Sequence, residues 1–339
     1  MSQIRVLSQQ DVLSLMTVKD AILADEKAYL QKAKGTGSVW PMVFHEFDPG
    51  KADLDIKSGD LKDDGVFGFK LVSWYGENPA RGLPELYGTS MLFDLSSGAP
   101  VALINAGALT GMRTGAAAAV GAKYLANPGS KVLLVVGTGH VSPYAVAATL
   151  IACPTIETVL WNNPRHPERI SEHVAELCDA VKDMLKTCGE ECHAEILPAP
   201  DIAKAASRAD VILTATPARE PVLRREWIRP GTHISCVGAD MCGKQELDSD
   251  IIAAAAVFVD DQTQSTTVGE CEIPIKTGRI AVEHLRGEIG DVIRGTKGRT
   301  SETDITVFDS SGIALQDLAC CAGILRKAEE LNIGVTVNI

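Results

Sequence analysis

The chain has 339 residues and a mass of 36.0 kDa, which is more than one hydrophobic core usually supports, so two domains are expected. Hydrophobic residues make up 45% of the chain and charged residues 22%, a globular balance that excludes a mainly disordered, collagen-like or coiled-coil protein. The formal net charge of -12 argues against nucleic acid as a partner, because such a chain has no general attraction to phosphate backbones.

The N-terminal segment MSQIRVLSQQDVLSL predicts neither a signal peptide nor a membrane anchor. Arg5 and Asp11 interrupt what would have to be an apolar run. No uncharged apolar stretch of about eighteen residues follows, so no contact with a membrane is expected. We therefore expect a cytoplasmic protein whose nine scattered cysteines are reduced thiols.

From about residue 10 to residue 125, strand-like runs are joined by turn-rich loops. The runs GVFGFKLVSWYG and TSMLFDLSSGAPVALINAG are typical of strands, and the loops contain DPG, KDDG and ENPARG. The Ala-rich segment LTGMRTGAAAAVGAKYLA then predicts a helix with Thr110 as its N-cap, which ends before Asn127-Pro128-Gly129. This order indicates an α+β domain.

Two cations of this zone are candidate ligands for an anion. Lys70 lies in the middle of an apolar strand, where it is either a residue of a solvated face or an inward cation, and the pattern leaves both open. Arg113 falls in the first turn expected for the Ala-rich helix, where a positive charge opposes the helix dipole. A bound carboxylate would offset that mismatch.

From about residue 130 the pattern changes to short apolar runs that alternate with helical stretches. The runs are KVLLVVGTG, TVLWNNP, ADVILTATP, THISCVGA and AVFVDD. Buried runs of this length, rich in Val, Ile and Leu, predict a parallel sheet of βαβ units. We therefore expect a doubly wound, Rossmann-type domain.

The first of these runs continues into a glycine motif that is typical of dinucleotide binding. In VLLVVGTGHVSPYAVAATL, Gly137 permits the tight turn and Gly139 lets the backbone approach a pyrophosphate. Ser142 is the small residue that allows close packing of strand and helix, and the free N–H groups of the helix N-terminus favour phosphate.

The second run ends where an acidic residue normally binds the adenosine ribose of NAD. Here the sequence reads Asn162-Asn163-Pro164-Arg165, with neutral amides followed by a cation that could face a 2'-phosphate. The alternative is that Arg165 and Arg169 are solvated residues at the start of a helix. We therefore expect NAD or NADP, with a weak preference for NADP.

The cluster Cys188, Cys192 and His193 is the strongest candidate for a metal site in the sequence. It lacks a second pair of ligands at zinc-finger spacing, so no metal is expected. Further along, Asp240 follows the run THISCVGA at the carboxyl end of a predicted parallel strand, where ligands collect in open α/β sheets, and Lys244 is four residues later. A role of Asp240 as a turn or cap residue stays open.

The last segment, SSGIALQDLACCAGILRKAEELN, has the apolar spacing of one more helix. We expect this helix to return to the first domain. The predicted domains are therefore residues 1–127 with 306–339 and residues 128–305, the second of which would bind the dinucleotide.

Five segments together resemble the ornithine cyclodeaminase and mu-crystallin family. They are GFKLVSWYGENPARGLP, FDLSSGAPVALINAGALTGMRTGAAAAVGAKYLA, VVGTGHVSPYAVAATL, ISCVGADMCGKQELDSDI and FDSSGIALQDL, in unbroken order from about residue 60 to residue 330. The resemblance implies a homodimer whose first domain supplies subunit contacts and substrate binding. It also implies an NAD(P)-dependent enzyme, since the family includes ornithine and lysine cyclodeaminases, alanine dehydrogenase and reductases of 2-imino acids.

The resemblance also assigns roles to residues. It implies that Lys70 and Arg113 bind the substrate carboxylate, that Asp240 faces the reacting nitrogen, and that Lys244 is its neighbouring loop lysine. Lys70 and Asp240 are thereby the expected catalytic residues. The expected contacts of the dinucleotide are Thr114, Gly137, Thr138, Gly139, His140, Val141, Ser142, Asn162, Asn163, Arg165, Ala215, Thr216, Val237, Gly238 and Ser310.

The chain departs from the family pattern in its early strands. An arginine that commonly follows a proline there is replaced by Val43 in VWPMVFHEF, with His45 shortly after it. LDIKSGDL places Lys57 where an apolar pair is usual, and we interpret Lys57 as the replacement cation, against the alternative of a solvated lysine. Asp55 stands where ornithine-specific members tend to have an acidic residue.

These residues favour hydride transfer between a small L-amino acid and its 2-imino acid. Lys57, Lys70, Arg113 and His45 would place more cations around one pocket than one carboxylate needs, which suggests a dicarboxylic imino acid such as iminosuccinate. If Asp55 or Asp60 neutralises Lys57, the substrate is monocarboxylic. The rival activities are an ornithine cyclodeaminase with recycled NAD and a crystallin-like protein that binds the nucleotide without turnover.

Overall fold

The computed structural model describes residues 3–339, and its contacts divide the chain into two compact units. The first unit is the chain up to Arg113 together with Ile313–Ile339, and the second is Thr114–Gly312. The sequence predicted boundaries at residues 127 and 305. The contacts place the first boundary after Arg113, inside the Ala-rich helix, and the second after Gly312. Within residues 3–339, no helix is both long enough and apolar enough to cross a membrane.

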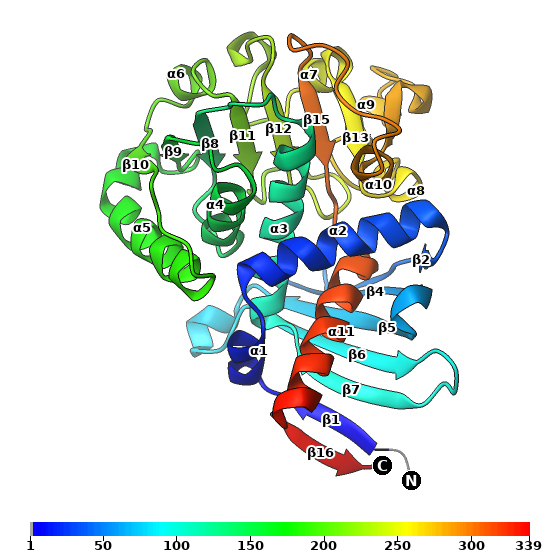
Figure 1. The fold of residues 1–339 in the computed structure, drawn as a ribbon. Coiled ribbons are helices and arrows are strands. Elements are labelled where there is room, and N and C mark those ends of the chain that lie inside the picture. The colour runs from blue at the N-terminus through cyan, green and yellow to red at the C-terminus, as the bar shows by residue number, and fades with distance from the viewer. Residues whose placement is uncertain (1–2) are drawn as a thin grey trace. The chain divides into compact units, whose positions relative to one another are not determined.

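The first unit is built on a mixed sheet, which is eight-stranded within the described residues (Figure 1). Its order is β16-β1-β7-β6-β5-β4-β2, and β3 pairs with β4. Only β1 and β7 pair in parallel in this part of the chain. The strands are β1 (Gln3–Leu7), β2 (Gly37–Val39), β3 (Val43–Asp48), β4 (Ala52–Leu61), β5 (Val66–Tyr75), β6 (Leu86–Asp94), β7 (Pro100–Asn105) and β16 (Val335–Asn338).

Two helices precede the antiparallel strands, in a stretch whose start was expected to be strands and loops. α1 (Gln9–Leu15) and α2 (Val18–Lys34) each begin with a capping box. In the second box, the Thr17 side chain accepts from the backbone N–H of Asp20, and the carboxylate of Asp20 accepts from the backbone N–H of Thr17. Such a box predicts a helix start from sequence alone, so the signal was present and was missed.

Helix α11 (Ala314–Leu331) packs across β4, β5 and β6, and α2 packs on α11 (Figure 1). Two glycines of the sheet make this approach possible. A Cβ at Gly59 would lie 2.9 Å from the Leu315 side chain, and one at Gly68 would lie 3.2 Å from the Leu318 side chain. The contacts place α11 in the first unit, as the sequence predicted.

Helix α3 (Gly107–Leu125) begins earlier than the sequence predicted. The prediction of Thr110 as its N-cap is wrong, because the Thr110 hydroxyl donates to the carbonyl of Ala106 at 2.8 Å from within the helix. Arg113 consequently lies in the second turn and not in the first. Its side chain is buried, at 7% exposure, so its charge needs a negative partner.

The second unit contains a sheet that is parallel throughout its described strands, in the order β10-β9-β8-β11-β12-β15-β13-β14. The order reverses at β8, since β9 and β11 flank it, and such a switch point is where open α/β sheets bind ligands. The strands are β8 (Val132–Val136), β9 (Thr158–Asn162), β10 (Glu195–Pro198), β11 (Val211–Thr214), β12 (His233–Cys236), β13 (Ala256–Val259), β14 (Leu285–Glu288) and β15 (Thr306–Asp309). The predicted doubly wound fold is confirmed.

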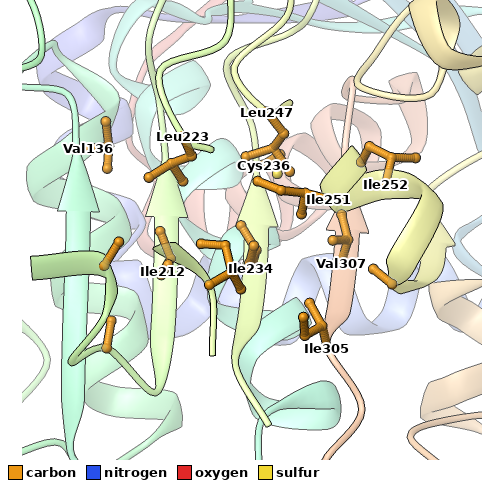
Figure 2. Close-up of a cluster of buried hydrophobic side chains, with 14 of the residues drawn as sticks. Val136, Ile212, Leu223, Ile234, Cys236, Leu247, Ile251, Ile252, Ile305 and Val307 are labelled. Carbon is orange, nitrogen blue, oxygen red and sulfur yellow. The ribbon is translucent and has the colours of Figure 1, made fainter. Parts of the chain in front are cut away.

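The side chains of these strands form a buried core that fixes where each strand ends. Figure 2 shows Val136, Ile212, Ile234 and Val307 of four neighbouring strands among apolar side chains of the covering segments. The helices of this unit are α4 (Val141–Ala152), α5 (Ile170–Thr187), α6 (Ile202–Ala206), α7 (Ser249–Ala254), α8 (Gln262–Ser265), α9 (Glu272–Lys276) and α10 (Ile289–Ile293). Because such interiors are close-packed, the loops beyond the strand ends start from rigid positions.

Candidate functional site

The second unit has a cavity of about 560 Å³ at the carboxyl ends of β8, β9 and β11. The cavity lies at the switch point of the sheet. Seven of its lining residues belong to the predicted dinucleotide set. The lining residues are Gly137, Thr138, Gly139, Asn163, Pro164, Arg165, His166, Ala215, Thr216, Pro217, Ala218 and Val222.

The two glycines of the motif are required for different structural reasons. Gly137 has a φ of 119°, and a Cβ there would lie 2.5 Å from the carbonyl oxygen of Ala215. At Gly139 a Cβ would meet no atom within 4 Å, so the missing side chain leaves open space in the cavity. The cradle therefore fits a phosphate group, which needs close approach of the backbone at the second glycine.

The first turn of α4 continues from this glycine turn. Ser142 is fully buried, and its N–H donates to the carbonyl of Gly139 at 3.1 Å. Ser142 is therefore a small, buried residue in the first turn of α4. The free N–H groups of the α4 N-terminus make this end of the cavity suitable for phosphate.

At the end of β9, the chain forms a tight turn beside the cavity. The carbonyl oxygen of the Asn163 side chain accepts from the backbone N–H groups of Arg165 and His166, at 3.2 and 3.1 Å. Its amide nitrogen donates to the hydroxyl of Thr138 at 3.2 Å. Asn163 thus ties the turn to the glycine motif, and no acidic residue is among the lining residues.

Asn162 lies elsewhere. It is buried, and its side-chain amide donates to the carbonyl of Ala199 at 2.7 Å, so it braces β9 against the next strand. The other predicted contacts that do not line the cavity are Thr114, His140, Val141, Ser142, Val237, Gly238 and Ser310.

In the first unit, three cations predicted from sequence lie in buried positions. Lys57 of β4 and Lys70 of β5 are directly opposite each other in the sheet, and their side chains are on the face that α11 covers. Lys57 is 7% exposed and Lys70 is 1% exposed. Lys70 Nζ donates to Oδ1 of Asp317 at 2.9 Å, and Arg113 Nε lies 3.3 Å from the same oxygen.

The charges of this cluster are strongly shifted by burial and by one another. Burial, followed by the charge of Arg113, lowers the pKa of Lys70 to about 8, and Asp317 opposes this shift. Burial works against ionisation of Asp317, but Arg113 and Lys70 outweigh it and hold the pKa of Asp317 below its ordinary value. The resident carboxylate is therefore ionised at neutral pH and shared by two cations.

Asp25 of α2 is a second carboxyl group of this region. It is fully buried, and its Oδ2 accepts from the side-chain amide of Gln316 at 3.1 Å. Burial raises the pKa of Asp25 well above its ordinary value, which favours the neutral form. Lys57, Lys70 and Arg113 are thus buried beside the ionised carboxylate of Asp317, with the carboxyl group of Asp25 nearby.

The structure does not bring His45 to this cluster. His45 lies on β3 opposite Leu54, one residue away from Asp55, so alternation directs its side chain to the other face of the sheet. All residues of β3 are exposed, and the His45 ring packs edge-on against Phe47. The prediction placed His45 from its distance along the chain, which does not specify the face of a strand.

Asp240 follows β12 in an exposed loop. Its side chain is 53% exposed, and its carboxylate pairs with Lys244 Nζ at 2.5 Å, so the two predicted loop residues do meet. The loop is fastened by Glu272, whose carboxylate accepts from the Cys242 thiol and from the Gly243 N–H, both at 2.8 Å. Asp240 is thus an accessible carboxylate on an anchored loop.

Sequence reasoning missed Asp317, Asp25 and Glu246. Asp317 is an acidic residue in the first turn of an otherwise apolar helical face, within LQDLACCAGIL, and this contrast was a usable signal. Glu246 is fully buried behind the cavity, and nothing in its local pattern distinguishes it from a surface acid. Within residues 3–339, no group of three or more His, Cys, Asp or Glu side chains is arranged to hold a metal ion.

The model of the ornithine cyclodeaminase/mu-crystallin family matches residues 3–332. Three solved structures each have a TM-score of 0.87 and cover 99% of this chain. An archaeal alanine dehydrogenase dimer with bound NAD is 34% identical, over 99% of its own chain. The Thermococcus litoralis Δ1-pyrroline-2-carboxylate reductase with NADH and L-proline is 30% identical, and the Paracoccus denitrificans iminosuccinate reductase with NAD+ is 31% identical, each over 100% of its own chain.

Proposed function

The chain belongs to the ornithine cyclodeaminase/mu-crystallin family, and from this premise we propose that it is a nicotinamide-dependent oxidoreductase of a small 2-imino acid and its L-amino acid. One observation carries the proposal. Lys57, Lys70 and Arg113 are buried in one cluster around the ionised carboxylate of Asp317. Such a cluster of buried cations would stabilise the carboxylate of an amino or imino acid.

In this proposal Lys70 and Arg113 bind the substrate carboxylate. Arg113 can bind both carboxylate oxygens with its planar guanidinium group, and Lys70 adds a second positive charge. Asp317 keeps both side chains in place before the substrate arrives, so little reorganisation is needed on binding. The positive field would also make the imine carbon more electrophilic.

Asp240 is the proposed proton donor and acceptor for the reacting nitrogen. It is accessible and pairs with Lys244. When bound, the nicotinamide supplies or accepts the hydride at C2 of the substrate. The residues that would hold the dinucleotide are those of the cavity, with Gly139 at the pyrophosphate and Arg165 at the adenosine ribose.

For the substrate we propose a dicarboxylic imino acid such as iminosuccinate. Lys57 is a third cation buried on the same face as Lys70, and its charge would stabilise a second carboxylate of the substrate. The similarity to iminosuccinate reductase supports this choice. The rival is a monocarboxylic substrate with Asp55 as partner of Lys57. Asp55 lies on the same sheet face as Lys57, whereas Asp60 pairs with Phe67 and lies on the other face.

Lys57→Met separates these two substrates. It should lower kcat/KM for oxaloacetate with ammonia by about tenfold or more, since an ion pair with a buried charge is lost, and change that for pyruvate with ammonia much less. Steady-state assays of both substrates in both proteins measure the ratio. A better reaction with pyruvate in the native protein, or an equal loss for both, would exclude the dicarboxylate.

For the cofactor we propose NADP, on the evidence of Arg165 and of a cavity lining without an acidic residue. The three solved relatives hold NAD, NADH and NAD+, which supports the nicotinamide but not the phosphate. Arg165→Ala should weaken binding of NADPH by about tenfold and leave that of NADH nearly unchanged. Equal effects on the two nucleotides in a fluorescence titration would refute the preference for NADP.

We also propose a homodimer that forms through the first unit. Large apolar side chains are exposed on β3 and β6, among them Val43, Phe44, Phe47 and Tyr87. Contiguous exposed apolar residues on strands mark surfaces that a partner covers. Light scattering after size exclusion should give twice 36.0 kDa at micromolar concentration. A monomer there would exclude this surface as a stable interface.

One assay tests the proposed activity as a whole. The protein is mixed with each reduced cofactor and a panel of 2-oxo acids, with ammonia or methylamine as the nitrogen source. Consumption of the cofactor with a subset of the acids is expected. Tight binding of the cofactor without turnover of any substrate would instead favour the crystallin-like binding protein.

A further inference from the structure

Glu246 lies fully buried behind the dinucleotide cavity and accepts four hydrogen bonds. Its Oε1 accepts from the backbone N–H and the hydroxyl of Thr216, at 2.7 and 2.8 Å. Its Oε2 accepts from the hydroxyl of Thr214 at 2.8 Å and from the backbone N–H of Gly238 at 2.9 Å. One carboxylate therefore joins the end of β11 to the loop after β12.

Two of the four donors belong to a residue that lines the cavity, Thr216. Thr216 lines it directly, together with Pro217 and Ala218. The backbone of the Glu246 segment holds the same loop, since the N–H of Gln245 donates to the carbonyl of Ala218 at 3.0 Å. A displacement of Glu246 would therefore move one wall of the cavity.

Gly238 is adapted to this carboxylate. A Cβ at Gly238 would lie 2.6 Å from the carboxyl carbon of Glu246, so only glycine allows its N–H to reach Oε2. Each oxygen of Glu246 thus accepts a hydrogen bond from one backbone N–H group. A backbone N–H group can donate a hydrogen bond but cannot accept one. Protonation would turn one oxygen into a donor and a poorer acceptor, and one of these two backbone bonds would weaken.

The groups that face Glu246 from neighbouring segments are also acids. Glu270 accepts from the backbone N–H groups of Glu246 and Leu247, at 2.8 and 2.9 Å, and Asp309 of β15 and Cys236 of β12 are buried with it. Burial raises the pKa of Glu246 to about 7, against its four hydrogen bonds, and raises the pKa of Asp309 to about 7. Burial raises the pKa values of Glu270 and Cys236 well above their ordinary ranges.

We propose that Glu246 is a positioning residue whose ionised carboxylate holds the Thr216 and Gly238 loops in the form that binds the dinucleotide, so that uptake of a proton by Glu246 weakens binding. The inference rests on the proposed function only in taking the cavity to be the dinucleotide site. Glu246 acts through the loops, since the cavity is lined by Thr216 and not by Glu246 itself.

The sign of the pH effect follows from the raised pKa. Above pH 7 the carboxylate is ionised and all four donors are satisfied, so affinity is highest there. From pH 8 to pH 6 the dissociation constant should rise by up to about tenfold, and about half a proton should be released on binding at pH 7.

The test uses NADH, because the 2'-phosphate of NADPH itself titrates in this range. Fluorescence titrations at pH 6, 7 and 8 and constant ionic strength give the dissociation constant for the native protein and for Glu246→Gln. We expect the rise toward pH 6 in the native protein, and a weak, pH-independent affinity in the variant. Calorimetry of NADH binding in two buffers measures the released proton without any variant.

Asp210→Asn is the matched control. Asp210 also accepts two backbone N–H bonds, from Lys131 and Val132 at 2.8 and 2.9 Å, but at the amino end of the sheet. The control should keep the native pH dependence, with some loss of thermal stability. A native affinity that does not change with pH, proton uptake on binding, or an unchanged pH dependence in Glu246→Gln would each overturn the inference. Absence of NADH and NADPH binding at every pH would refute the proposed function instead.

Discussion

Replacement of Gly139 by valine should reduce dinucleotide binding by more than about a hundredfold while the protein stays folded. A Cβ built at Gly139 meets no atom within 4 Å, so valine would extend into the open space of the cavity. That space is where a pyrophosphate must approach the backbone. Titration with NADH and NADPH measures the loss, and thermal unfolding should show little change.

Gly137→Ala is the contrasting variant for this prediction. Gly137 has a φ of 119°, and a Cβ there would lie 2.5 Å from the Ala215 carbonyl oxygen, so alanine is strained in its backbone and in its contacts. This variant should lose thermal stability as well as binding. If Gly139→Val binds either nucleotide with native affinity, the glycine turn does not hold the pyrophosphate.

Asp240→Asn should lower kcat by about a hundredfold to ten-thousandfold, with the affinity for the dinucleotide within about twofold of the native value. Asparagine keeps the size of the side chain but cannot exchange a proton. The proposal assigns that exchange with the reacting nitrogen to Asp240. Steady-state kinetics together with a binding titration separate the two effects.

Asp201→Asn is the control variant, because it removes a carboxylate whose only assigned role is to cap a helix. The Asp201 side chain accepts from the backbone N–H of Lys204 at 3.0 Å and caps α6, so its replacement should reduce stability slightly and leave kcat unchanged. Near-native turnover of Asp240→Asn would show that the proton moves through another group and that Asp240 only pairs with Lys244.

Features of this fold that depend on residues close together in the sequence could be predicted from it. The run VLLVVGTG contains the strand, the turn and the helix start within a few residues, and each is specified by local sterics. The same holds for α1 and α2, whose capping boxes were present in the sequence and were missed. The α3 start was misplaced because Thr110 bonds within the helix, as hydroxyls also do there.

The parts of the site that could not be predicted depend on pairing between distant segments. Alternation places Lys57 and Lys70 on one face, but only the return of α11 covers that face and brings Asp317 to Lys70. The face of His45 was set by the pairing register of β3, which the sequence did not specify. Glu246 meets its donors from β11 and from the loop after β12 only after the sheet has formed.

The cyclodeaminase rival differs from the proposed reductase in what happens to the cofactor. A cyclodeaminase would use Asp55 and Asp240 for the second amine of ornithine and would regenerate the oxidised nucleotide in each turnover. A reductase consumes one reduced nucleotide for each amino acid that it forms. The distinction is one of stoichiometry and needs no assumption about the substrate side chain.

The most direct test of net hydride transfer therefore compares two incubations of the native protein. In the first, a reduced nucleotide, ammonia and a 2-oxo acid are followed by nicotinamide absorbance while the L-amino acid is quantified. In the second, ornithine is incubated with a trace of oxidised nucleotide while ammonia and proline are quantified. We expect equal amounts of nucleotide consumed and amino acid formed in the first, and no proline in the second. Release of ammonia and proline from ornithine, many times in excess of the nucleotide and without a net absorbance change, would contradict the account.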